Sequence, residues 1–193
     1  MKTILVSRCV DDMWRNRASG YGWIAIGIHW MMAVLILGLF ALGLWMVELN
    51  YYSQWYQVAP YWHKGLGGVV FALLLLRLGI RLGDQQPSAL GKGAEVVLAK
   101  IVHLALYLLP LGLVISGYLI STADGRALEL LGLVSIPSLV SFPGQEDTAG
   151  QIHGVLAWLL IALVSAHALA AIKHHLINRN ATLLRMLRPQ KEI

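Results

Sequence analysis

Four long apolar segments dominate the pattern of hydrophobic and polar positions along the chain. They cover about residues 23–47, 61–82, 97–121 and 152–176, and each is long enough to cross a bilayer as a helix, for which roughly 20 residues suffice. None alternates apolar and polar residues as a membrane β-strand does, and a helix satisfies its own backbone hydrogen bonds inside lipid. The pattern therefore predicts an all-α fold, an integral membrane four-helix bundle, with a kink at Pro110 in the third segment.

The segments outside the predicted helices set the expected boundaries. We expect a polar N-terminal tail over 1–20, a transmembrane domain over 21–188 and a C-terminal tail over 189–193. The N-terminal tail carries two aspartates and has no short apolar core, so it does not have the pattern of a cleavable signal. Met13 is an alternative start, because the residues before it add nothing to the membrane pattern. The apolar part of the long connection 122–151 predicts a short helix lying on the outer surface.

The composition agrees with a membrane protein and narrows the possible chemistry. Apolar residues make up 58% of the 193 residues and charged residues 13%, which is about half of the usual charged share. A chain of this size cannot hide so much apolar surface from water inside one core. Its single cysteine, Cys9, excludes an intramolecular disulfide framework and a site with several thiolate ligands.

The charged residues are divided unevenly between the two ends of the predicted helices. Thirteen of the fifteen Lys and Arg residues lie in the two tails and around the second connection, and only Lys64 and Arg126 lie on the opposite side. By the positive-inside rule, both termini are expected to be cytoplasmic. Because the basic residues gather at helix ends rather than in a stripe with interleaved aromatic residues, nucleic-acid binding is disfavoured. Five carboxylates against two cations give the outer side a formal charge of −3: Glu48, Asp124, Glu129, Glu146 and Asp147.

Histidines inside the apolar segments are the main candidates for chemistry, because a polar side chain in lipid is costly and usually has a partner or a function. His153 and His167 are separated by about four helical turns in the fourth segment. At 100° and 1.5 Å per residue, they project from nearly the same face about 21 Å apart along the helix. His29 lies level with His167 near the cytoplasmic end, and His63 lies level with His153 near the outer end. These heights predict two pairs across the bundle, one inner and one outer.

Each pair could clamp a flat cofactor from both of its faces. Bis-imidazole ligation of a haem iron fits, because imidazole is a good iron ligand and four-helix bundles hold cofactors between facing helices. A zinc or copper site is the alternative, but no third nitrogen, thiolate or carboxylate recurs at the same height. A single histidine could equally be an ordinary core residue, so the hypothesis depends on the matched pairs. Neighbouring glycines would let a porphyrin approach the backbone: Gly27, Gly65, Gly67, Gly68 and Gly154.

Five motifs of the chain resemble those of a known family. They are HW at 29–30, WHKGLGG at 62–68, HLALYLLP at 103–110, IHGVLAWLLIALVSAHALAAIKHH at 152–175 and NATLLRML at 180–187. Together they resemble the bacterial cytochrome b-561 family of four-helix, dihaem inner-membrane cytochromes. The resemblance covers about residues 20–188.

The resemblance implies two noncovalently bound haem b groups in a multi-pass protein of the bacterial inner membrane. Its axial ligands fall on His29, His63, His153 and His167, the same four histidines that the helix geometry selects. The chain has no CxxCH motif for covalent haem attachment, which agrees with haem b.

Three further histidines lie near the expected cytoplasmic side. His103 belongs to the third segment and matches a family histidine, whereas His174 and His175 end the fourth segment. A quinone head group needs a hydrogen-bond donor and a proton source, and histidine supplies both. His103 and either His174 or His175, with Lys100 or Lys173, are therefore a candidate ubiquinone site. The alternative is that they face lipid headgroups at the helix ends.

Four cations could meet an anionic group near the expected haems. Arg77 and Arg81 could pair with propionates of the inner haem, since arginine pairs well with carboxylates, or could serve as positive-inside anchors. Lys64 and Arg126 could meet the propionates of the outer haem or an anionic electron donor.

Two functions are consistent with these features. The first is electron transfer across the inner membrane between a periplasmic donor and the ubiquinone pool. Some members of the family oxidise superoxide, so a superoxide:ubiquinone oxidoreductase is one concrete form. An outer side of negative charge would repel that anion unless Lys64 and Arg126 focus the field locally.

The second function is that of a non-enzymatic electron-transfer subunit serving a dedicated protein redox partner. A haem-based sensor is disfavoured, because two six-coordinate haems leave no open position for a ligand.

Overall fold

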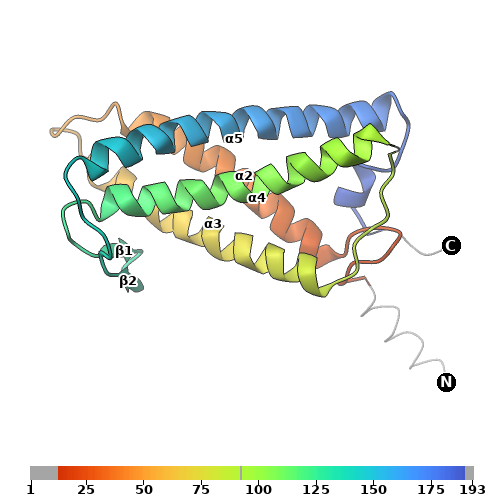
Figure 1. Ribbon diagram of the computed structural model, residues 1–193, viewed down its shortest axis with the longest axis horizontal. Coiled ribbons are helices and arrows are strands. Elements are labelled where there is room, and N and C mark those ends of the chain that lie inside the picture. The colour runs from red at the N-terminus through yellow and green to blue at the C-terminus, as the bar shows by residue number, and fades with distance from the viewer. Residues whose placement is uncertain (1–12, 92, 190–193) are drawn as a thin grey trace, which may run out of the picture.

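Four long helices form the body of the computed structural model, which describes residues 13–91 and 93–189 (Figure 1). They are α2 (Trp23–Met46), α3 (Val58–Gly83), α4 (Ala94–Ser121) and α5 (Gln145–Leu176). All four are long and apolar enough to cross a membrane. The predicted all-α membrane four-helix bundle is confirmed. The largest difference from the predicted segments is that α5 begins at Gln145, ahead of residue 152.

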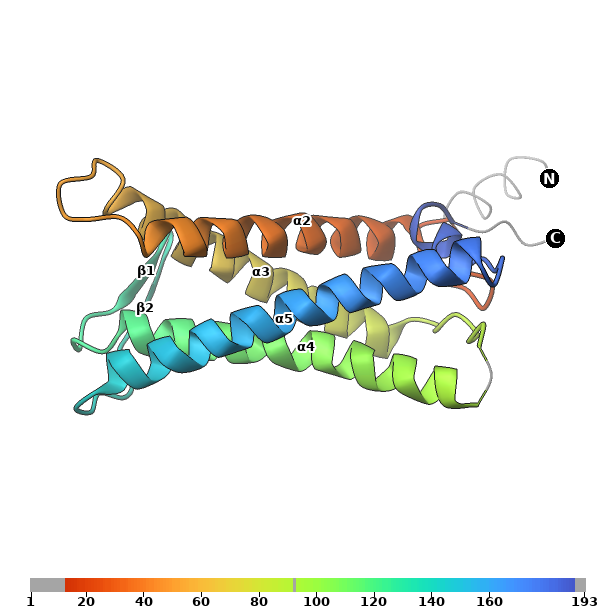
Figure 2. The same cartoon turned by 90° about the horizontal axis from the view of Figure 1, so that it is seen from above.

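The helices pack mainly as two neighbouring pairs, α2 with α3 and α4 with α5, and α5 also contacts α2 (Figure 2). A small apolar core between α2 and α3 contains Ile28, Met32, Val70 and Leu74. Few other residues of the helices are buried, and the side chains on their outward faces are largely apolar. Such outward faces suit contact with lipid hydrocarbon rather than with water.

We call the end of the bundle at which α2 begins and α5 ends the inner end, after the expected orientation, and the opposite end the outer end. Both described ends of the chain fold against the inner end. The backbone N–H of Asn16 donates to Asp84 Oδ2 at 2.8 Å. A short 3₁₀ helix, η1 (Leu184–Met186), lies near the start of α2, where Trp30 Nε1 donates to the carbonyl of Met186 at 2.6 Å. Cys9 and the cations Lys2, Arg8, Lys92 and Lys191 lie outside the described residues.

The outer connection contains a β-hairpin, so the short helix expected there is wrong. Strands β1 (Leu128–Leu130) and β2 (Val134–Ile136) pair antiparallel. Between them, Leu131 and Gly132 both have positive φ angles, 54° and 69°. This turn matches the twist of a hairpin and is favoured by glycine. The apolar composition of this connection indicated that it packs against the bundle, but the turn at Leu131 and Gly132 makes it a hairpin rather than a helix.

The hairpin packs against the glycine-rich start of α3. A side-chain carbon at Gly65 would overlap the side chain of Leu131, and one at Gly68 would come within 2.9 Å of Leu130. Two of the glycines that we expected to face a porphyrin therefore face leucines of the hairpin. The hairpin lies at the outer end, beside α3 and α4 (Figure 1).

Candidate functional site

The structure brings together the two histidines of each expected pair. The ring centres of His29 on α2 and His167 on α5 are 6.4 Å apart at the inner level. Those of His63 on α3 and His153 on α5 are 6.2 Å apart at the outer level. Helix α5 is continuous through both levels and contributes one histidine to each pair.

These separations fit two imidazoles on one iron. An imidazole nitrogen bonds a first-row metal ion at about 2.0 Å, and the ring centre lies about 1.1 Å behind that nitrogen. Two imidazoles on opposite sides of one iron therefore have ring centres about 6.2 Å apart. The described residues contain no group of three or more His, Cys, Asp or Glu side chains that could hold a metal ion. A porphyrin would supply the four remaining ligands of a six-coordinate iron held by either pair.

The two levels of the site are separated by two heptads of sequence on every helix. On α5 the residues at the two levels are His153 and His167, and on α3 they are His63 and Arg77. Arg77 lies at the inner level, because its Nη1 donates to His29 Nδ1 at 2.9 Å. A heptad repeat returns a side chain to the core face of a bundled helix. The residues at the two levels of each helix therefore face the interior.

Helices α2 and α4 follow the same spacing with glycine at the outer level. Gly43 lies two heptads after His29, and a side-chain carbon there would come within 3.2 Å of the His63 ring. Gly117 lies two heptads after His103, and a side-chain carbon there would come within 3.4 Å of the His153 ring. The sequence analysis missed both glycines, although their two-heptad spacing from histidines could have revealed them.

The glycines close to the histidines in sequence do not have this role. Side-chain carbons at Gly27, Gly67 and Gly154 would meet no atom within 4 Å. Gly154 and Gly27 are one and two residues from a histidine and so point about 100° and 200° away from it on the helix, whereas Gly67 lies one turn beyond His63. The close approaches come instead from the neighbouring helices.

Hydrogen bonds to the candidate ligands differ between the two levels. At the outer level, Ser116 Oγ lies 3.0 Å from His153 Nδ1, whereas His63 Nδ1 is buried with no partner among the described residues. At the inner level, Arg77 donates to His29 Nδ1. Arg81, one turn further along α3, lies with its guanidinium carbon 5.7 Å from the centre of the Tyr107 ring.

Comparison with known sequences agrees with this arrangement. A family model described as "Prokaryotic cytochrome b561" matches residues 20–189. The chain belongs to this family. It is therefore a multi-pass protein of the bacterial inner membrane that binds haem b and transfers electrons.

Curated relatives of this cytochrome b561 chain match nearly their whole length. "Cytochrome b561 homolog 2" of Escherichia coli (strain K12) is 42% identical over 175 residues, which cover 89% of this chain and 93% of the relative. "Probable superoxide oxidase CybB" of Yersinia pestis is 29% identical over 178 residues, covering 89% and 97%. "Cytochrome b562" of Cereibacter sphaeroides is 28% identical over 176 residues, covering 89% and 97%.

The three candidate quinone residues of this cytochrome b561 make different contacts. The ring centre of His103 is 5.4 Å from that of His167, so His103 lies beside the inner pair. His174 Nδ1 is 3.0 Å from the Asn178 amide nitrogen, and His175 Nδ1 is buried with no partner among the described residues. No hydrogen bond or ring contact among the described residues joins His103 to either of the other two.

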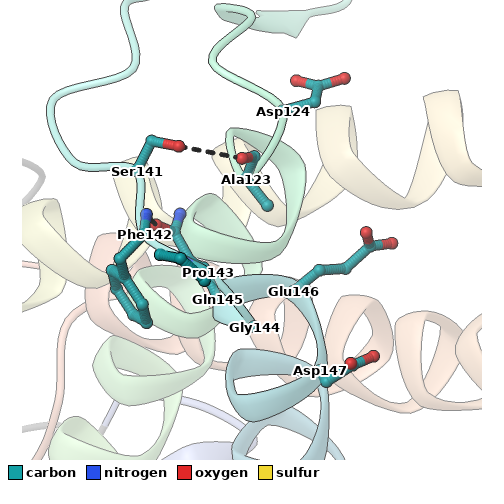
Figure 3. A pocket seen from close by; sticks show the side chains of 9 residues that line it. All are labelled: Ala123, Asp124, Ser141, Phe142, Pro143, Gly144, Gln145, Glu146 and Asp147. Atoms are coloured by element: carbon teal, nitrogen blue, oxygen red, sulfur yellow. Dashed lines mark hydrogen bonds between the residues drawn. The ribbon is translucent and has the colours of Figure 1, made fainter.

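The outer end presents carboxylates around an open pocket, which Figure 3 shows from close by. Asp124, Glu146 and Asp147 line it, together with residues of the loop before α5. Arg126 Nε donates to Asp124 Oδ2 at 2.6 Å, and this hydrogen bond holds the pKa of the Asp124 carboxyl below its usual value. The charge of Arg126 is thus paired within its own loop, whereas Lys64 is exposed beside the outer pair.

Proposed function

We propose that this cytochrome b561 carries two haem b groups and moves electrons across the membrane between a periplasmic donor and ubiquinone. His29 and His167 would hold the inner haem, and His63 and His153 the outer one. The observation that carries the proposal is the pair of ring separations, 6.4 Å and 6.2 Å, at two levels of one continuous helix. Haem b, when bound, supplies a one-electron carrier at each level.

The separation of the levels suits a relay across the membrane. The histidines on α5 are about four helical turns apart, which corresponds to about 21 Å along the helix axis. This distance is most of the roughly 30 Å hydrocarbon thickness, so one site lies in each half of the bilayer. An electron entering at the outer level then crosses the hydrocarbon in short steps rather than in a single long one.

The inner level has cationic and proton-carrying groups beside the candidate ligands. Arg77 lies within hydrogen-bond reach of the inner pair and is the cation best placed to neutralise a haem propionate, because a guanidinium matches a carboxylate in shape and charge. His103 is the favoured quinone-site residue of the three candidates, since it is the one that lies beside the inner pair. It could donate a hydrogen bond and a proton to a quinone oxygen. His174 and His175, further along α5, would serve the proton path from the inner surface.

Superoxide is our first candidate donor, because a relative at 29% identity is named a probable superoxide oxidase. Two superoxide anions would each give up one electron and leave as dioxygen, while one ubiquinone takes up two electrons and two protons. With Arg126 paired to Asp124, the exposed Lys64 beside His63 is the cation that would attract the anion at the outer end.

The carboxylates of the outer end support a second candidate, a basic redox protein as the donor. Asp124, Glu146 and Asp147 line one open pocket there (Figure 3). A surface of negative charge attracts a positively charged partner and repels superoxide. In this case the chain would be an electron-transfer subunit rather than an enzyme.

One experiment with the purified, haem-loaded protein separates the two candidates. Superoxide is generated enzymatically in the presence of a soluble ubiquinone, and haem reduction and ubiquinol formation are followed together. The superoxide function predicts ubiquinol formation that is abolished by superoxide dismutase and weakened in Lys64→Gln. Haems that are reduced by ubiquinol but not by superoxide at any concentration would rule out the superoxide function and leave the protein-donor one.

A further inference from the structure

Ser116 lies on α4 against the outer candidate ligand. It is 4% exposed, and its Oγ is close to three polar atoms. The carbonyl oxygens of Gly112 and Leu113 are 2.8 Å and 3.1 Å away, and His153 Nδ1 is 3.0 Å away. All three contacts involve a hydroxyl group that has only one proton to donate.

That single proton determines the direction of the bond to His153. A backbone carbonyl can only accept, and a serine in a membrane helix commonly donates to the carbonyl three or four residues before it, so we assign the Ser116 proton to Gly112 or Leu113. The contact with His153 Nδ1 is then made by a ring N–H that donates to Ser116 Oγ. A neutral imidazole with its proton on Nδ1 has a free lone pair on Nε2, which is the form that binds a metal.

We propose that Ser116 is a positioning residue for the outer haem, an inference that rests on the two-haem function proposed above. It holds the His153 ring in the tautomer and orientation that ligation requires. By accepting the Nδ1 proton, it also raises the basicity of the ligand. A more basic imidazole stabilises ferric over ferrous iron, so Ser116 lowers the reduction potential of the outer haem.

His63 and His29 lack this arrangement. His63 Nδ1 is buried without a partner among the described residues. His29 Nδ1 accepts from Arg77, which leaves the neutral ring with its proton on Nε2, the nitrogen that ligation would need to be free. Ser116 therefore distinguishes the outer level from the inner one.

The test compares Ser116→Ala and Ser116→Thr in the haem-loaded protein by redox titration, with His29→Ala used to assign the spectrum of the outer haem. In Ser116→Ala, the ratio of reduced to oxidised outer haem at a fixed ambient potential should rise about three- to ten-fold. The outer haem should also be lost to apomyoglobin about ten-fold faster, while the inner haem is unchanged. Ser116→Thr keeps the hydroxyl and should restore both properties.

Thr122→Val is the matched control. Thr122 is buried at the C-cap of α4, and its Oγ1 donates to the carbonyl of Tyr118 at 2.9 Å, with no hydrogen bond to a histidine among the described residues. If loss of the backbone-directed hydroxyl acts only by changing the helix, this variant should reproduce the change seen in Ser116→Ala. The inference would be overturned if Thr122→Val reproduced the change. It would also be overturned by an unchanged outer haem in Ser116→Ala or by equal shifts in the alanine and threonine variants of Ser116. Failure of the two-haem function is distinguishable, because it would be seen as a single haem in the unaltered protein.

Discussion

Removing the histidines singly and in pairs tests the ligand assignment directly. In the proposed assignment, each of His29→Ala, His63→Ala, His153→Ala and His167→Ala would delete one of two axial ligands of one haem. Because α5 is continuous and its two histidines are about 21 Å apart, the levels lie beyond the roughly 10 Å over which substitutions usually couple. Each single variant should therefore lose one haem of two and keep the other.

Double variants make the prediction sharper, because they distinguish matched from mismatched pairs. His63→Ala with His153→Ala removes both ligands of one haem, so it should keep one haem per chain, as each single variant does. His63→Ala with His167→Ala removes one ligand from each haem and should keep none. The pattern depends only on which histidines share a haem, and not on how much each substitution destabilises the protein.

The assay is a pyridine haemochrome count on purified protein, normalised to protein by amino-acid analysis and checked against the amount inserted in the membrane. His103→Ala is the control and should keep both haems, because its ring centre is only 5.4 Å from that of His167, too close for opposite ligands of one iron. Loss of a haem in His103→Ala, with two retained in His29→Ala, would show that the inner pair is assigned wrongly. One haem left in the mismatched double variant would refute the pairing altogether.

Three further predictions concern groups around the pairs. Gly43→Val should make the outer haem dissociate about ten-fold faster, because the new side chain meets a ligand ring; Gly38→Val on the same helix, where a side-chain carbon meets nothing within 4 Å, should not. Arg77→Met should lower the reduced fraction of the inner haem at a fixed potential by about three- to ten-fold, since a nearby cation favours the reduced form; an unchanged redox titration would exclude the guanidinium from that site. Asp124 is ionised at neutral pH, as an ordinary carboxyl is, and Arg126 holds its pKa below the usual value. Asp124→Asn should therefore speed haem reduction by superoxide several-fold at low ionic strength, and the gain should vanish in high salt if its origin is electrostatic.

The helices and the two levels could be predicted from the sequence because both depend on periodicity within one element. Apolar length alone located the four spans. The heights of His29 and His63 could be compared with those of α5 because an α-helix has a fixed rise, and alternate spans run in opposite directions. The contacts between the rings agree with that comparison.

The parts that the sequence did not reveal depend on contacts between elements. The stretch around Leu131 is apolar enough for a surface helix, but two successive positive φ angles make it a hairpin, and apolar composition does not contain that information. Ser116 was not singled out because a serine in a membrane helix usually bonds only its own backbone. Its contact with His153 depends on how α4 lies against α5. The candidate quinone site of His103 with His174 or His175 was inferred from depth alone and stays a prediction, because depth does not determine which faces of two helices meet.

The shared two-heptad spacing explains how one bundle could hold two similar groups with different properties. Two heptads bring the same face of each helix back to the core, so each of the four helices contributes one residue to each level. The contributions at the outer level are two histidines and two glycines, whereas those at the inner level are three histidines and Arg77. A cofactor at the outer level would meet the backbone of α2 and α4 at Gly43 and Gly117. Its ligand His153 would already have its proton on Nδ1, as metal binding requires. A cofactor at the inner level would meet a cation that is hydrogen-bonded to His29 Nδ1, which leaves the proton of the neutral ring on Nε2, the nitrogen that ligation needs free. Because a nearby cation favours the reduced form and the Ser116 acceptor favours the oxidised form, the two proposed haems would differ in reduction potential, and the difference would favour electron transfer from the outer haem to the inner one.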